Sequence, residues 1–369
     1  MLALVSVEGR VPPEHPLRLV KPLVDEVLRD LSAEFDAMYS NVGRPSVPPE
    51  RLLKAMLLMA LYGIRSERQF CEQLAYNMLF IWFLDMDLTE KAFDATVFSK
   101  NRQRLLDRDM ARVFFDAVVD KADQRRLLSH EHFAVDGTLV EAWGSFKSFR
   151  PKVGDTDDNN SFVDFKGKQR RNDTHESKTD PDAKLYRKGR GREAKLSHMA
   201  HVLMENRNGL VVDAELTEAN GTAERAAALD MMDRERERRE TRKRRQKRKQ
   251  QKSARKKTRK GRRLTLAADR GYDTKDFVAA CRERRFTPHV TQFINPRRRS
   301  AVDGRTTHHP GYAVSQRARL LIEKVFGWMK AAAGFRRSRY RGRPRTRAAA
   351  LFVLSTYNLI RICKLAPTA

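Results

Sequence analysis

The sequence predicts an all-helical N-terminal domain, residues 1–125, followed by an α/β domain, residues 126–369. In the first part, apolar residues recur at helical spacing. In the second part, short apolar runs typical of strands alternate with helical segments. A chain of 369 residues with 40% hydrophobic content is long enough to bury a core in two or three domains.

The N-terminal domain is expected to consist of helices separated by proline and glycine. Apolar spacing predicts a first helix at Leu17–Phe35 and a second at Pro49–Tyr62, with a proline in its first turn. Residues 66–84 are rich in aromatic side chains and are expected to form one or two short core helices. These segments predict a compact helical bundle.

A further helix is expected to start at Asp94 or Thr96 and to carry basic residues on its outer side. The basic residues are Lys100, Arg102 and Arg104. A helical domain that presents a basic helix is typical of a DNA-contacting module. A solvated basic surface is an equally good interpretation of the same residues.

The α/β domain is expected to begin with a strand around Asp136 and Gly137, inside the apolar run of residues 133–140. Residues 144–194 are interpreted as a polar insertion with little core. Two apolar runs around the Asn-Gly pair of residues 206–209 then predict a β-hairpin, followed by a helix from about Thr222.

The remaining segments continue the alternation. A strand is expected to end at Asp269, followed by a helix at residues 274–284, another strand, a helix at residues 316–330 and a last core helix at residues 346–365. Residues 237–263 form a basic insertion, with 15 Lys/Arg and no Asp or Glu from Arg242 to Arg263. That run is either an extended charged helix or a disordered arm.

The net charge points to a polyanionic partner. The chain has 75 Lys and Arg against 47 Asp and Glu, which gives +28. Nucleic acid is favoured over a membrane, because the longest apolar run, residues 52–61, is interrupted by Lys54 and is too short to span a bilayer. The N-terminus does not resemble a signal peptide, so we expect the protein in the cytoplasm.

Metal ligands of the cysteine and histidine type are not favoured. The three cysteines lie far apart without a Cys-x-x-Cys pair, which argues against a disulfide framework and a structural zinc site. His198 and His201 are three residues apart on a strand and face opposite sides, so both are interpreted as structural.

The predicted helix at Gln316–Lys330 carries a charged side. At about 100° per residue, Gln316, Arg319, Glu323 and Lys330 project within roughly 60° of one another. Taken alone, this is a surface helix with an Arg319–Glu323 pair at i,i+4 spacing. Asp136 and Asp269 change that interpretation.

Three carboxylates can meet if these elements pack together. Asp136 lies in an apolar strand, Asp269 ends a later strand, and Glu323 lies on a helix that can cross the sheet. Three hard oxygen ligands suit Mg²⁺ or Mn²⁺. Two such ions about 3.5–4 Å apart can activate a nucleophile and stabilise the leaving oxygen of a phosphodiester.

Each aspartate also has a simpler interpretation. Asp136 can cap a turn with Gly137, and Asp269 can start the turn at the following residues. Asp273 and Asp276 are better explained as an N-cap and a first-turn charge of the next helix. Glu141 is a rival ligand, but its odd offset from Asp136 places it on the opposite face of the strand.

The chain resembles the DDE transposases of bacterial insertion sequences, through FAVDGT, AADRGYD and the spacing of Arg319, Glu323 and Lys330. GRPSVPPERLLKAMLL, RSERQF and FSKNRQRL are similar to the IS-five-type branch, whose last catalytic helix carries a Tyr-Arg-Glu-Lys motif. The resemblance covers nearly the whole chain. One departure is Gln316, which stands at the position of the tyrosine.

The resemblance implies a ribonuclease-H-like core with a mixed five-stranded sheet. It also implies that Asp136, Asp269 and Glu323 are the catalytic metal ligands, and that Arg319 and Lys330 contact DNA. Gln316 can still bond a phosphate but cannot stack. The expected cofactor is Mg²⁺ or Mn²⁺, with two ions at each active site.

The expected activity is metal-dependent cleavage and strand transfer of DNA. The expected partners are double-stranded DNA, both the terminal inverted repeats and the target, and a second copy of the chain, because strand transfer joins two ends. The bacterial family implies a nucleoid-associated protein. Two alternatives remain: a non-catalytic nucleic-acid binder derived from a transposase, and a host nuclease of the same fold.

Overall fold

The computed structural model describes residues 6–38, 47–152, 170–187, 189, 191, 193–250, 264–294 and 299–365. The chain divides into two compact units. The helical unit consists of Met1–Leu127, Gly327–Arg339 and Pro344–Ala369. The sheet unit consists of Leu128–Phe326 and Tyr340–Arg343.

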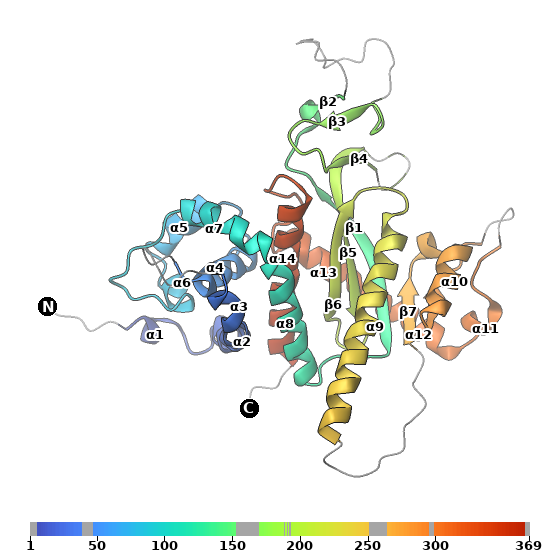
Figure 1. Cartoon of the computed structure of the whole chain (residues 1–369), viewed down its shortest axis with the longest axis horizontal. Helices are drawn as coiled ribbons and strands as arrows, with labels where there is room; N and C mark the ends of the chain where they lie inside the picture. Colours follow the sequence, from blue (N-terminus) through green and yellow to red (C-terminus); the bar gives the residue numbers. More distant parts are fainter. Residues whose placement is uncertain are drawn as a thin grey trace. The chain divides into compact units, whose positions relative to one another are not determined.

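The described part of the helical unit begins with eight helices (Figure 1). They are α1 (Val7–Arg10), α2 (Leu17–Asp30), α3 (Ser32–Asp36), α4 (Pro49–Leu61), α5 (Glu67–Leu74), α6 (Met78–Phe83), α7 (Thr96–Asp107) and α8 (Met110–Gln124). The single helix predicted for Leu17–Phe35 is wrong, because the helix is interrupted at Leu31, whose φ of −101° and ψ of 8° leave the helical region.

Aromatic side chains fill the core of the helical unit. Phe70 stacks on Phe80 with ring centroids 5.4 Å apart and meets Phe98 edge-on at 6.1 Å. All three side chains are buried. The aromatic segment before residue 84 therefore forms the core that its composition predicts, and it joins α5 and α6 to α7.

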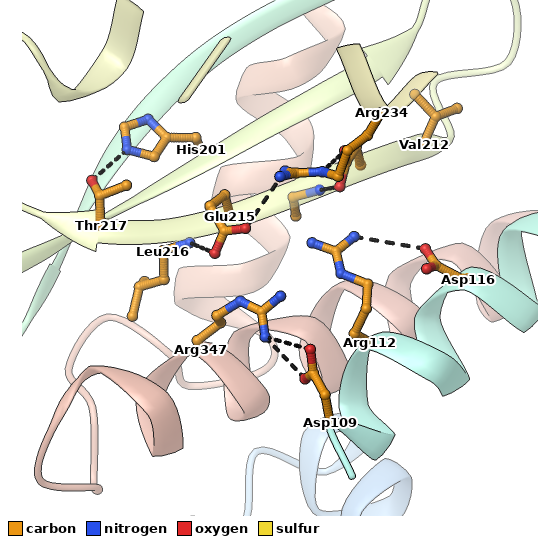
Figure 2. Close-up of polar contacts among 12 residues, drawn as sticks. Asp109, Arg112, Asp116, His201, Val212, Glu215, Leu216, Thr217, Arg234 and Arg347 are labelled. Carbon is orange, nitrogen blue, oxygen red and sulfur yellow. Dashed lines mark hydrogen bonds and ion pairs between the residues drawn. The ribbon is translucent and has the colours of Figure 1, made fainter. Parts of the chain in front are cut away.

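The last helix, α14 (Arg343–Leu365), packs in the helical unit and not in the α/β core where we expected it. Phe352 contacts Phe114 of α8 with ring centroids 5.9 Å apart. Arg347 donates to both carboxylate oxygens of Asp109, at 2.9 and 3.0 Å (Figure 2). An apolar helix can cover either core, so its periodicity alone does not identify its partner.

By length and composition, α14 is the one described helix that would also suit a membrane span. In its most apolar window, 56% of the residues are buried. That degree of burial is typical of the core helix of a folded domain, which passes the same test of length and apolar content.

The sheet unit contains a six-stranded mixed sheet (Figure 1). Its strands are β1 (His132–Glu141), β4 (Lys184–Tyr186), β5 (Lys195–Glu205), β6 (Val211–Glu218), β7 (Leu264–Ala268) and β8 (Phe286–Val290). The order is β6-β5-β1-β7-β8, and β4 pairs with the start of β5. Antiparallel pairs join β6, β5 and β1, whereas β7 and β8 run parallel to β1. This is the ribonuclease-H-like arrangement that was expected, except that the short β4 adds a sixth strand to the five that were predicted.

The predicted hairpin is present between β5 and β6. Gly209 has a φ of +71°, which a glycine adopts without strain. The buried carboxylate of Glu205 accepts hydrogen bonds from the backbone N–H groups of Arg207, Asn208 and Leu210, at 2.7 to 3.2 Å. A single acidic side chain therefore stabilises the whole turn.

The described part of the segment 144–194 holds a two-stranded sheet of β2 (Phe149–Pro151) and β3 (His175–Ser177), with a short 3₁₀ helix, η1 (Phe146–Ser148), before it. Its small core joins Phe149 and Ala183 to Leu196 of β5. The buried Asp180 lies 3.2 Å from Nε2 of His198, so His198 is a structural residue as expected. Residues 153–169 lie outside the described part.

Among the residues that the structure describes, four α-helices accompany the sheet. They are α9 (Ala223–Gln250), α10 (Lys275–Glu283), α11 (Gly304–Thr307) and α12 (Pro310–Arg319). The first packs on β5 and β6, and α12 packs on β1, β7 and β8. Residues 237–250 are a continuation of α9 and not the start of a separate insertion. The rest of the predicted basic run, 251–263, lies outside the described residues.

Candidate active site

Asp136 and Asp269 occupy neighbouring positions on adjacent parallel strands. β1 pairs with β7 so that Ala134 is opposite Ala267. Asp136 lies two residues after Ala134, and Asp269 lies two residues after Ala267, with extended backbone at φ −77° and ψ 177°. Continued by two residues, the register places the two carboxylates side by side at the carboxyl end of β7.

Both aspartates belong to the sheet face that α12 covers. His289 of β8 bonds through Nδ1 to the hydroxyl of Ser315 on α12, at 2.7 Å. His289 pairs with Ala267, which pairs with Ala134, and paired residues share one face. Two residues farther along, side chains return to the same face, so Asp136 and Asp269 project toward the side of α12.

Each aspartate also bonds to its own backbone. Oδ1 of Asp136 accepts from the N–H of Gly137 at 2.7 Å, and Oδ1 of Asp269 accepts from the N–H of Gly271 at 2.8 Å. The simpler interpretations of these residues, as a turn cap and a turn start, thus describe real contacts. They orient the carboxylates and leave Oδ2 of Asp269 without a hydrogen bond among the described residues.

Tyr272 is a residue of this site that the sequence did not point out. Its side chain is fully buried, and its hydroxyl has no hydrogen-bond partner within the described residues. Burial raises the pKa of the phenol well above its usual value. That pKa is raised further by three nearby carboxylates, those of Glu224, Asp136 and Asp269. The aromatic residue in AADRGYD was the available signal.

The start of α9 reaches the same two strands. A Cβ on Gly137 would lie 2.9 Å from Oε1 of Glu224, so a larger residue there would require the Glu224 side chain to move. The neighbouring Arg225 donates to the backbone oxygen of Gly271 at 3.2 Å. The first turn of α9 therefore contacts both segments that carry the predicted catalytic aspartates.

The continuous helix predicted for Gln316–Lys330 is wrong. It is interrupted at Leu320, between α12 and α13 (Leu321–Ala331). At this junction the N–H of Leu320 bonds to Arg317 and that of Glu323 bonds to Leu320, both with three-residue spacing. Arg319 and Glu323 therefore belong to different helices, and among the described residues they form no ion pair.

Gln316 has a structural role in the sheet unit. Its amide nitrogen donates to the backbone oxygen of His289, and its amide oxygen accepts from the hydroxyl of Thr291 at 2.8 Å. Both ends of the amide hold α12 against the end of β8. This structural role uses one of the two N–H donors of the amide, so the predicted DNA contact of Gln316 stays a prediction.

Arg319 and Glu323 differ from Gln316. Arg319 follows Ser315 by one helical turn, on the side of α12 that faces the sheet, and its Nε is buried without a hydrogen-bond partner in the described part of the chain. Glu323 is exposed in the first turn of α13, and its carboxylate has no partner among the same residues. Lys330, near the end of α13, belongs to the helical unit.

The basic residues of α7 are not equivalent. Lys100 and Arg104 are exposed, as predicted. Arg102 is half-buried and bonds to Oε2 of Glu67 at 2.6 Å, so its prediction as an outward DNA contact is corrected. Glu67 lies on α5, and a partner 35 residues away could not be identified from the spacing within one helix.

Asp273 is not the helix cap that we expected. Its buried carboxylate accepts from the N–H groups of Phe293 and Ala301, at 2.7 and 2.8 Å, while the hydroxyl of Thr274 caps α10. Asp273 thus joins the two ends of the loop after β8. The rival ligand Glu141 bonds to Lys195 at 2.9 Å.

The three predicted ligands are carboxylates, which suit a hard divalent cation, but the described structure does not bring all three together. Among the described residues, no three His, Cys, Asp or Glu side chains are close enough to hold a metal ion. The register brings together two carboxylates, and α13 carries the third from the helix that follows α12. Carboxylate oxygens are what Mg²⁺ and Mn²⁺ prefer.

Comparisons with solved structures give weak likenesses to complexes of the Mos1 transposase. A pre-cleavage Mos1 transpososome is 12% identical, with 88% of this chain and 80% of that chain covered and a TM-score of 0.21. A Mos1 mariner paired-end complex with Mn is 14% identical, with 91% and 92% covered and the same TM-score. Likenesses this weak add nothing to the fold described above. No curated protein matches.

Family models match nearly the whole chain. A transposase domain, DUF772, matches residues 5–104, and a transposase DDE domain matches residues 127–359. The second match covers more than half of the chain and contains the whole described sheet together with both aspartates. The chain belongs to the DDE-domain transposases.

Proposed function

We propose that this transposase cuts DNA at the ends of an insertion sequence and joins the freed 3′ ends to target DNA, with Asp136, Asp269 and Glu323 as its catalytic carboxylates. The observation that supports this best is the register of β1 and β7, which sets Asp136 beside Asp269 on the face covered by α12. Glu323 lies in the first turn of α13, which is separated from α12 by the single residue Leu320.

The carboxylates would hold one or two Mg²⁺ or Mn²⁺ ions. When bound, such ions lower the pKa of an attacking water and stabilise the leaving oxygen of a phosphodiester. Closure of the site requires Glu323 to approach the aspartates, since no three acidic groups meet in the described structure. DNA binding would drive that closure, because the approach of three carboxylates is unfavourable until cations and substrate compensate their charge.

The chemistry needs no protein nucleophile. In the first step a water oxygen attacks phosphorus and the 3′ oxygen leaves. In the second step that 3′ hydroxyl attacks a target phosphate, and the 3′ oxygen of the target strand leaves. Arg319, with a guanidinium nitrogen that has no partner among the described residues, would contact a phosphate beside the carboxylates. Tyr272, which is buried near Asp136 and Asp269, would pack beneath the two aspartates and hold them in position.

The proposal also includes the branch of the family, the DNA partners, the oligomeric state and the cellular location. The chain belongs to the IS-five-type branch, with Gln316 in place of the motif's tyrosine. The DNA partners are terminal inverted repeats and a target duplex, with Lys100, Arg104 and Lys330 as further phosphate contacts. The active complex is a homodimer or larger, since two ends are joined. The protein works in the bacterial cytoplasm, at the nucleoid.

A cleavage assay on DNA that carries the inverted repeats flanking the gene tests this proposal. We expect Mg²⁺- or Mn²⁺-dependent nicking at the repeat ends and a joined product with target DNA. Cleavage without a joined product would identify a host nuclease. Binding without cleavage under any divalent metal would identify a non-catalytic DNA binder and would overturn the catalytic assignment.

A further inference from the structure

A large open groove lies in the sheet unit where β7 and β8 begin. It has a volume of about 1840 Å³, and the first residues of the two strands, Leu264 and Phe286, lie in its wall. Sites for small molecules usually measure about 300–1,000 Å³. The groove is therefore of a size that suits part of a macromolecule.

The groove is lined by more basic than acidic residues. Seven arginines and four acidic residues lie in its wall. The arginines come from α9, α10, α11 and two turns. We call it the basic groove and define it by Arg207, Arg236, Arg239, Arg282, Arg285 and Arg305. Arginines converging from separate elements on one open groove are typical of a surface that binds phosphates.

Two of these arginines have no internal partner. Arg282 pairs with Asp303 at 3.0 Å, and Arg284, beside it, pairs with Asp233 at 2.9 Å. Arg285 and Arg305 are exposed, and neither side chain has a hydrogen bond or ion pair with another described residue. Among the arginines of the groove, these two therefore have charges that no described side chain compensates.

Arg285 stands where a glycine would be the favoured residue. It directly follows the C-cap of α10, and its φ is +63°. Helices commonly end with a glycine or asparagine in this left-handed conformation, which is strained for a residue with a long side chain. Folding alone therefore gives no reason for an arginine here, whereas a role for its side chain in the groove does.

We infer that the basic groove binds the phosphate backbone of a DNA duplex, away from the phosphate that is cut. Asp269 follows the carboxyl end of β7, whereas the exposed arginines Arg285 and Arg305 lie on the segments before β8 and on α11, and the groove wall continues along β8 to His289. Leu264, the residue of β7 in the groove wall, lies five residues before Asp269, which is about 16 Å at about 3.3 Å per residue. The inference rests on the proposed function, and the bound segment is either the flank of the element end or the target duplex.

The test measures DNA affinity and folding stability in the same variants. Arg285→Gly and Arg305→Ala are compared with Arg187→Ala, an exposed arginine outside the groove. Fluorescence anisotropy with a 30-base-pair duplex, without divalent metal and over a range of salt, reports binding. Thermal unfolding reports stability.

We expect each groove variant to bind about three- to tenfold more weakly and to lower the slope of log affinity against log salt by about one. Arg285→Gly should unfold at the same or a higher temperature, because it removes the strained conformation. Affinities equal to wild type, or weaker binding only together with a lower unfolding temperature, would overturn the inference.

Two further comparisons show which DNA segment the groove binds, and they distinguish a failure of this inference from a failure of the proposed function. If the groove holds the flank of the element end, shortening that flank should abolish the difference between Arg285→Gly and wild type. If it holds the target, the difference should persist on unrelated duplexes and in strand transfer. A wild type that binds through the groove but never cuts contradicts only the proposed function, whereas groove variants that bind normally while wild type cuts contradict only the inference.

Discussion

The register of the parallel strands β1 and β7, continued by two residues, places Asp136 beside Asp269, the residue that follows β7, on the face of the sheet that α12 covers. The two residues are more than 130 positions apart in the chain. The pairing of β1 with β7 is what makes them neighbours, and neither strand alone forms the site. The position of the active site thus follows from sheet topology, as in other open sheets with ligands at the carboxyl ends of strands.

Replacement of either aspartate by asparagine should abolish cleavage without unfolding the protein. Asp136→Asn and Asp269→Asn keep the shape and one acceptor oxygen, but remove the charge that a divalent cation requires. We expect Mg²⁺-dependent cleavage to fall at least about 100-fold. The exposed Asp276 of α10 supplies the control, Asp276→Asn. Equal activity in all three variants would contradict the assignment.

Arg319→Ala should reduce cleavage far more than it reduces stability. The Nε of Arg319 is buried without a partner in the described structure, so its removal relieves an unsatisfied donor while it loses some packing. We expect the free energy of unfolding to change by less than about 1 kcal/mol and cleavage to fall at least about tenfold. A variant that unfolds early but cuts normally would assign Arg319 to structure alone.

Glu323→Gln separates a metal ligand from a surface residue. Glu323 is exposed and unpaired among the described residues, so the substitution should leave the unfolding temperature unchanged. If Glu323 joins the aspartates when DNA binds, cleavage should fall at least about 100-fold. Mn²⁺ binding measured calorimetrically in the presence of DNA should weaken as well. Lys324→Gln, at the next exposed position, is the control.

Local patterns predicted the elements that carry the site. The Asn-Gly pair gave the hairpin, and apolar runs gave the strands of Asp136 and Asp269. The mixed sheet with helices was predictable because each element has its own periodicity. The neighbourhood of the two aspartates followed from the family resemblance and from the order of strands.

Long-range contacts account for what the sequence did not reveal. Arg102 pairs with Glu67 on another helix, and Asp273 bonds to backbone more than 19 residues away. The interruption at Leu320 has no proline or glycine to mark it. Hydrophobic periodicity identifies the buried side of a helix but not the surface that covers it, as α14 illustrates.

Asp273→Ala should destabilise the sheet unit. The carboxylate is buried and accepts hydrogen bonds from the N–H groups of Phe293 and Ala301. Its loss leaves two backbone donors near the loop after β8 without that acceptor, which should lower the free energy of unfolding by about 2–3 kcal/mol. Chemical denaturation measures this effect. An unchanged midpoint, equal to that of Asp276→Ala, would show that the loop adapts.

His201 should make the protein less stable as the pH falls from 6.5 toward 4. Burial lowers the pKa of His201 to about 4, from an ordinary value of 6.5. In this window the unfolded chain binds a proton at His201 and the folded chain does not, so the free energy of unfolding falls by up to about 1.4 kcal/mol per pH unit. Above pH 6.5 both states are neutral at this residue, and the effect vanishes.

His201→Gln isolates this contribution. Glutamine cannot titrate and can still reach the hydroxyl of Thr217, to which Nε2 of His201 bonds at 2.8 Å (Figure 2). Urea unfolding between pH 7 and pH 5, before most carboxylates titrate, should show a smaller slope of stability with pH than wild type. Part of the slope should remain, because burial also lowers the pKa of His289 to about 4. A slope equal to wild type in His201→Gln would mean that His201 titrates alike in both states.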